Sequence, residues 1–103
     1  MTIQVRHDEK QSKFYADVEG TEGTAGAEGG GAVIEYEKRG DTYDLLHTFV
    51  PPSLRGQGVA DELARQTLDQ IRSEGGRIVA SCPFLHSFVE RHPEYRDLVA
   101  ATA

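Results

Sequence analysis

One short segment of the chain combines residues that together can bind an anion. Arg55-Gly56-Gln57-Gly58 follows an apolar run that ends at Val50 and a Pro51-Pro52 corner, and apolar residues then recur at helical spacing. The first N–H groups of a helix have no internal partner, and the helix dipole favours negative charge there. Glycine lets a ligand approach the backbone, and an arginine fork can hold two phosphate oxygens. This order of strand, turn and helix start predicts a phosphate pocket.

The plain alternative is a strand-to-helix turn whose glycines serve geometry alone. Taken by itself, the segment supports this alternative about as well as it supports a binding site. It is not a Walker-type loop, because the lysine and its spacing are missing. It is not a dinucleotide fingerprint either, because a third glycine at the required offset is missing.

The single cysteine, Cys82, is the second residue with chemical potential. It lies at the carboxyl end of an expected parallel strand, where open α/β sheets bind their ligands. A helix is expected to begin directly after it, which favours a thiolate. The alternative is a buried small hydrophobe, the commonest role of a free cysteine. We place Cys82 in the active site, and rank a covalent acyl-cysteine role below that placement.

His47 stands between Leu46 and Thr48 in an apolar run. A lone histidine there is usually a satisfied core residue, but its ring can serve as a general base near neutral pH or activate Cys82. His92 is interpreted as a helix-end cap. Histidines and carboxylates never occur at metal-ligand spacing, so no metal site is predicted.

Hydrophobic periodicity predicts the elements that must position these residues. The expected strands begin at Ile3 and continue with Phe14–Val18, Ala32–Lys38, Tyr43–Val50 and Arg77–Cys82, and the expected helices are 56–74, 84–92 and a last one from Pro93. Residues 39–42 form a turn, and Gly75-Gly76 ends the long helix. The fold class is therefore α+β (mixed α/β): N-terminal antiparallel strands lead into a strand-helix-strand parallel pair, and short helices follow.

The strand Tyr43–Val50 carries apolar residues on both faces. Strict alternation assigns Tyr43, Leu45 and Phe49 to one face, and Leu46 and Val50 to the other. A strand that is covered on both faces lies at or near the centre of its sheet. We therefore expect this strand to be central or close to the centre of the sheet.

Composition limits the remaining possibilities. The 103 residues suit one domain, residues 1–103, and the net charge of −6 with no basic cluster argues against a nucleic-acid partner. No apolar stretch is long enough to span a bilayer, and the N-terminus lacks an apolar leader, so a cytoplasmic location is expected. One cysteine excludes an internal disulfide and a thiolate-rich zinc site. The segment Gly20–Gly31 is rich in glycine, which predicts a loop. The sequence does not indicate an oligomeric state.

Four stretches of this sequence carry a family resemblance. Arg55-x-x-Gly58-x-Ala60 resembles the acetyl-coenzyme A signature of the GNAT superfamily of N-acetyltransferases. Together with the stretch from His47 to Pro52, with Cys82-Pro83-Phe84, and with the stretch from Arg91 to Tyr95, it resembles the miniature GNAT-like family, which keeps only the coenzyme A-binding core. The resemblance covers roughly Phe14 to Val99. The segment Gly20–Gly31 departs from it, because a tight hairpin is expected there.

The resemblance implies a site for acetyl-coenzyme A. The pyrophosphate would bind the N–H groups of Gly56 to Ala60, and the pantetheine arm would run along the end of the strand Tyr43–Val50. The implied cofactor-binding residues are Thr48, Phe49, Val50, Arg55, Gly56, Gln57, Gly58, Val59, Ala60, Phe84, Ser87 and Phe88, and the implied catalytic residues are His47 and Cys82. Tyr95 matches a family residue, but its place on a terminal helix favours packing over proton donation.

Three functions follow from this reading. The preferred one is an N-acetyltransferase that moves an acetyl group from acetyl-coenzyme A to an amine acceptor, a small molecule or a protein, without a covalent intermediate on Cys82. The first alternative is a coenzyme A-binding module with little or no catalysis, including a redox version in which Cys82 pairs with the coenzyme thiol. The second alternative is a protein-interaction domain without a small ligand.

Overall fold

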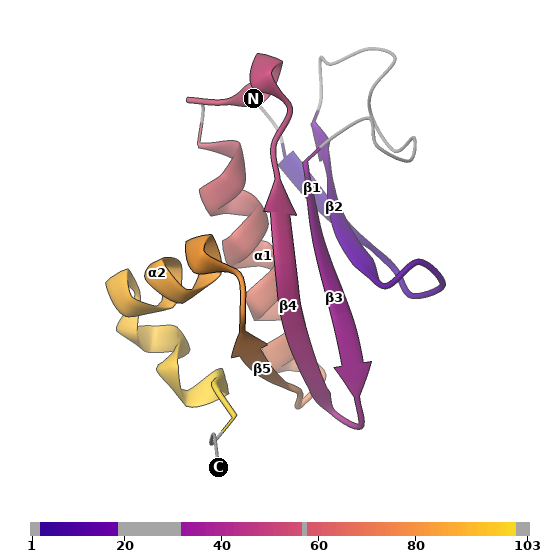
Figure 1. Ribbon diagram of the computed structural model, residues 1–103, viewed down its shortest axis with the longest axis vertical. Helices are drawn as coiled ribbons and strands as arrows, with labels where there is room; N and C mark the ends of the chain where they lie inside the picture. The colour runs from indigo at the N-terminus through magenta and orange to yellow at the C-terminus, as the bar shows by residue number, and fades with distance from the viewer. Residues whose placement is uncertain (1–2, 19–31, 57, 101–103) are drawn as a thin grey trace.

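The computed structural model describes residues 3–18, 32–56 and 58–100 (Figure 1). Within these ranges the strands are β1 (Ile3–Asp8), β2 (Lys13–Val18), β3 (Val33–Arg39), β4 (Thr42–Phe49) and β5 (Arg77–Ala80). The α-helices are α1 (Val59–Ser73) and α2 (Pro83–Arg91), and the 3-10 turns are η1 (Pro52–Leu54) and η2 (Pro93–Leu98). The predicted loop Gly20–Gly31 lies outside the described residues.

The strands form one mixed sheet in the order β1-β2-β3-β4-β5. Each neighbouring pair from β1 to β4 is antiparallel, whereas β5 lies parallel to β4 and is reached through α1. Figure 1 shows α1 crossing behind the sheet, and α2 beside the sheet where the chain leaves β5. The predicted mixed α+β fold with a strand-helix-strand parallel pair is confirmed.

Glycines in left-handed conformations set both ends of α1. Gly56 and Gly58 each have φ of 79°, so the helix begins at Val59 and not at the predicted residue 56. At the other end, Gly75 has φ of 77° and donates its N–H to the Arg72 carbonyl, as a glycine that closes a helix does. The turn before α1 is therefore longer than the periodicity indicated.

The hydrophobic core lies between one face of the sheet and the two helices. Phe14, Ile34 and Leu45 from the strands, Leu63, Leu68 and Ile71 from α1, and Leu85 and Phe88 from α2 are all between 0% and 1% exposed. The apolar spacing of α1 is what aims one stripe of this helix at the sheet.

A bulge in β4 changes which side chains this strand buries. Tyr36 pairs with Leu45 and Glu35 pairs with His47, so Leu46 is an extra residue opposite the β3 step. The bulge reverses the alternation beyond it, and Phe49 therefore leaves the face that holds Leu45. Phe49 is 47% exposed.

The expectation that β4 is covered on both faces is wrong for this reason. The helices cover the face of Tyr43 and Leu45, whereas Phe49 on the other face is exposed. The position of β4, second from the edge of the sheet, is as predicted.

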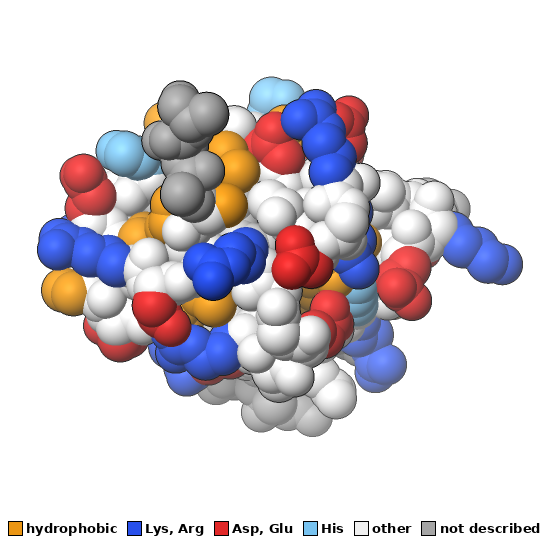
Figure 2. Space-filling view, turned by 90° about the horizontal axis from the view of Figure 1, so that it is seen from below, with side chains coloured by type: hydrophobic (Ala, Val, Ile, Leu, Met, Phe, Trp, Pro, Cys, Tyr) orange, Lys and Arg blue, Asp and Glu red, His pale blue; other side chains and the backbone are white. Residues whose placement is uncertain are grey.

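The surface shows mixed charge. Figure 2 shows the molecule of Figure 1 from below. On this face acidic and basic side chains are interspersed, with hydrophobic side chains between them. No helix in the described part of the chain is long and apolar enough to cross a membrane.

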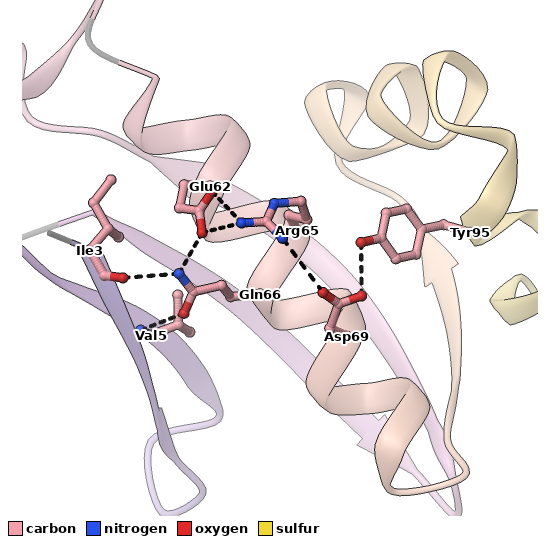
Figure 3. A network of polar contacts seen from close by, with 7 residues as sticks. All are labelled: Ile3, Val5, Glu62, Arg65, Gln66, Asp69 and Tyr95. Carbon is pink, nitrogen blue, oxygen red and sulfur yellow. Dashed lines mark hydrogen bonds and ion pairs between the residues drawn. The ribbon is translucent and has the colours of Figure 1, made fainter. Parts of the chain in front are cut away.

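A polar network on the outer side of α1 joins this helix to both ends of the fold (Figure 3). Gln66 accepts a hydrogen bond from the Val5 N–H at 3.1 Å and donates one to the Ile3 carbonyl at 2.9 Å. These are backbone groups of β1, which is an edge strand of the sheet. One glutamine amide thus pairs the edge of β1 as a neighbouring strand would.

The same network reaches η2 at its other end. The carboxylate of Asp69 accepts a hydrogen bond from the Tyr95 hydroxyl at 2.8 Å, and burial and this carboxylate together raise the pKa of Tyr95 to about 12. Tyr95 is 4% exposed. This contact and the burial of the ring agree with the prediction that Tyr95 has a packing role.

We predict that Gln66→Ala lowers the free energy of unfolding by about 1–2 kcal/mol, because two partly buried backbone groups lose their partner. The matched control is Gln4→Ala, which truncates an exposed glutamine of β1. This variant should cost at most about 0.5 kcal/mol of unfolding free energy. Urea unfolding of both variants measures the difference. Equal losses in the two variants would show that Gln66 does not hold the edge of β1.

Candidate functional site

The parallel pairing of β4 with β5 stops partway along β4. The register runs from Thr42 opposite Arg77 to Leu45 opposite Ala80, and the Cys82 N–H then donates to the Leu45 carbonyl at 2.9 Å. The strand β5 ends at Ala80, two residues earlier than predicted, and Pro83 begins α2. Beyond Leu45, no described residue of β5 pairs with β4, although β3 still pairs with its other side as far as Phe49. We call the end of this parallel pairing the splay.

An open pocket of about 340 Å³ lies where the chain turns from β4 into α1. Its lining residues are Val50, Leu54, Arg55, Gly56, Gly58, Val59, Ala60 and Asp61. A Cβ added at Gly56 or at Gly58 would meet no atom within 4 Å, so the two glycines are needed for their backbone angles. The predicted pocket at the helix start is thus present as a hollow.

The N-terminus of α1 lies at this pocket, and its first N–H groups precede the hydrogen-bond ladder of the helix. The first helical hydrogen bond runs from the Glu62 N–H to the Gly58 carbonyl at 3.1 Å, so the N–H groups of Val59, Ala60 and Asp61 precede the ladder. Gly58 has no side chain that could cap them. Together with the positive end of the helix dipole, these groups suit a phosphate.

Arg55 connects the pocket to the end of β4. Its Nε donates a hydrogen bond to the Val50 carbonyl at 2.9 Å, which folds the guanidinium over the stretch between strand and helix. A guanidinium has five donors, so the terminal nitrogens can bind an anion while Nε keeps this bond. Gln57, another predicted cofactor contact in this turn, lies outside the described residues.

Cys82 lies at the splay, and its neighbour is Thr48. The side chain of Cys82 is 5% exposed at the N-terminus of α2, and its Sγ lies 3.4 Å from the Thr48 Oγ1. Thr48 pairs with the buried Ile34, so its side chain faces the helix side of the sheet. The contact between Thr48 and Cys82 was not predicted.

His47 lies on the opposite face of the sheet from Cys82. It pairs with Glu35, both residues are exposed, and adjacent strand residues point to opposite faces. The structure therefore does not bring His47 and Cys82 together, because the bulge at Leu46 sets which neighbour faces the thiol. His47 instead lies on the open face, beside the splay.

The three residues of α2 that the resemblance implies as cofactor contacts divide between core and surface. Phe88 is 1% exposed and stacks on the His92 ring, whose Nδ1 lies 2.8 Å from the Phe88 carbonyl. Phe84 is half-buried and Ser87 is exposed. His92 thus has the predicted structural role at the end of α2.

A second hollow, of about 390 Å³, lies on the other side of β5, and the sequence did not indicate it. Val79, Ala80, His86, Glu90, Arg96, Val99 and Ala100 line it. Among the residues that the structure describes, no three histidine, cysteine or acidic side chains are grouped as metal ligands.

Comparison with protein families places most of the chain in one of them. Residues 13–98 match the family model described as GCN5-related N-acetyltransferase. This range contains β2 to η2 and both sides of the splay.

Curated relatives agree with the match. Protein NATD1 of Gallus gallus is 34% identical over 92 residues, which span 88% of this chain and 77% of the relative. Protein NATD1 of Xenopus tropicalis is 32% identical over 93 residues, which span 89% of this chain and 79% of the relative.

One solved structure supports the fold. A GCN5-like protein from Staphylococcus aureus, determined by NMR in solution, superposes with a TM-score of 0.66 and 24% sequence identity. The match covers 97% of this chain and 90% of the other. At this identity the similarity establishes the fold alone.

We predict that Thr48→Val slows alkylation of Cys82 by iodoacetamide about fivefold, because the thiolate loses a hydrogen-bond donor worth about 1 kcal/mol. His47→Ala is the matched control and should leave the rate unchanged, since His47 lies on the other face. The rate is followed by mass spectrometry of the intact protein. A slower reaction in His47→Ala with no change in Thr48→Val would reverse this assignment.

Proposed function

We propose a function from one premise, that the chain belongs to the GCN5-related N-acetyltransferase family. Membership identifies the chain as an acetyltransferase, and we infer that acetyl-coenzyme A is its donor and an amine its acceptor. The observation that carries this proposal is the pocket at the start of α1, which opens beside the unpaired stretch of β4. Hydrogen-bond donors for its phosphates and a strand edge for its amides are the two features that coenzyme A needs.

The pyrophosphate of the coenzyme would bind at the start of α1. The N–H groups between Gly56 and Ala60 would donate to its oxygens, and the terminal nitrogens of Arg55 would add a charge-assisted contact. The bond from Arg55 to the Val50 carbonyl supports this arrangement, because it orients the guanidinium before the ligand arrives. The family resemblance also implies Gln57 as a contact of the pyrophosphate.

The pantetheine arm would lie along β4 where β5 has left it. Its amide groups can pair with the free backbone groups near Thr48, Phe49 and Val50, in the way that a peptide adds a strand to a sheet edge. This direction leads from the pocket toward Cys82 and α2. Phe84, Ser87 and Phe88 of α2 would then form the opposite side.

The reaction would take place at the point of the splay. A neutral amine attacks the thioester carbonyl, a main-chain N–H of β4 stabilises the oxyanion, and the tetrahedral intermediate expels the coenzyme thiolate. The attacking nitrogen must lose a proton, and His47 on the open face is our candidate base. Acceptor and base would approach from the face that carries Leu46 and Phe49.

The covalent variant would use Cys82 as nucleophile. Its thiolate would attack the thioester, release coenzyme A and carry the acetyl group until the amine takes it. We favour direct transfer, since His47 and Cys82 lie on opposite faces of β4 and cannot act as a nucleophile–base pair.

We predict that the protein releases coenzyme A from acetyl-coenzyme A only when an amine acceptor is present. His47→Ala should lower kcat about a hundredfold, as expected for loss of a general base. His86→Ala, an exposed histidine on α2, is the matched control. Cys82→Ala should keep at least about a tenth of the activity if transfer is direct. Thiol release with a panel of small amines, polyamines and lysine peptides measures these rates.

The outcomes separate the three functions. A loss of all turnover in Cys82→Ala would establish the covalent route. Coenzyme binding without turnover for any amine would make the chain a coenzyme A-binding module. No binding of coenzyme A or acetyl-coenzyme A would leave a protein-interaction domain.

A further inference from the structure

One residue of the pocket carries the wrong charge for a phosphate ligand. Asp61 is the third residue of α1, is exposed, and lines the same hollow as Arg55, Gly56 and Gly58. Arg55 and Asp61 are the two ionisable residues among the lining side chains that the structure describes. The pocket thus combines an attractive and a repulsive charge.

The carboxylate has a clear benefit in the empty site. Asp61 lies in the first turn of α1, where a negative charge interacts favourably with the helix dipole and the free N–H groups. A bound phosphate would use the same dipole and the same donors. Asp61 and an anionic ligand therefore compete for one electrostatic field.

We propose that Asp61 limits the affinity of this site for its coenzyme. This inference rests on the proposed function, because it takes the phosphates of coenzyme A as the ligand. The repulsion between the carboxylate and the phosphates offsets part of the attraction of Arg55. The site then binds the coenzyme more weakly than its backbone geometry permits, and spent coenzyme is released more readily.

The charge balance also predicts the effect of salt. In the wild type, the attraction of Arg55 and the repulsion of Asp61 act on the same ligand, and salt screens both. Removal of the repulsion leaves attraction alone, so binding becomes more sensitive to ionic strength. A change in hydrogen bonding or packing would not produce this signature.

The test is a calorimetric titration of coenzyme A into the wild type and into Asp61→Asn, which keeps the shape of the side chain. We expect Asp61→Asn to bind about three- to tenfold more tightly at low salt, and this gain to shrink as salt is raised from about 0.05 to 0.5 M. The control is Asp41→Asn, which removes the same charge at the β3–β4 turn, the opposite end of the eight-residue strand β4. Its affinity should be unchanged, and circular dichroism confirms folding of both variants.

Dephospho-coenzyme A identifies the phosphate that Asp61 opposes. An equal gain for both coenzymes assigns the repulsion to the pyrophosphate, and a gain for coenzyme A alone assigns it to the 3′-phosphate. Unchanged or weaker binding by Asp61→Asn, while the wild type binds, would overturn the role of Asp61 and leave the proposed function intact. No binding of coenzyme A by either protein would overturn both.

Discussion

The parallel pairing between β4 and β5 ends at Leu45 and Ala80, halfway along β4, and this early end shapes the site. Two local features cause it: the extra residue Leu46 changes the register of β4, and Pro83 starts α2 just after β5. A proline has no N–H to donate to a sheet. The last bond, from the Cys82 N–H to the Leu45 carbonyl, closes the pair. Beyond it, no described residue of β5 pairs with β4 on this side.

The start of α1 is built to complement that opening. Left-handed angles at Gly56 and Gly58 turn the chain so that the helix begins beside the free end of β4, and Arg55 holds the two together through the Val50 carbonyl. The N–H groups suited to phosphates and the strand edge suited to amides thus come from one continuous stretch of chain, residues 46–61. The cost of this arrangement is a set of unpaired polar groups, which a coenzyme with phosphates and amides can satisfy.

The sequence predicted the order of elements well, because each element has a local signature. Alternation in β2 and β3, helical spacing in α1 and glycine after it are properties of neighbouring residues. The bulge at Leu46 is different, because it exists only in the pairing of β4 with β3, which lie side by side through tertiary structure. Strict alternation therefore assigned Phe49 to the wrong face.

The same limit applies to the site. A pocket at residues 56–60 was predicted from the local glycines, and the hollow lies there. The contact between Thr48 and Cys82 joins strands that are far apart in sequence, and its direction depends on the bulge. Asp61 was overlooked because an acidic residue in a first helical turn is ordinary; only the pocket shows which ligand it would face.

In the function we propose, backbone N–H groups at the start of α1 and along the end of β4 hold the coenzyme. A titration of the ¹⁵N-labelled protein with coenzyme A, followed by NMR of the backbone amides, tests this binding mode. We expect the largest shifts at Gly56, Gly58, Val59 and Ala60, and a second group at residues 48–50. Gly58→Ala should abolish the first group, whereas Gly40→Ala, with a similar left-handed backbone at φ of 63°, should not. Shifts confined to other surfaces, or equal effects of the two glycine variants, would show that the coenzyme does not bind these groups.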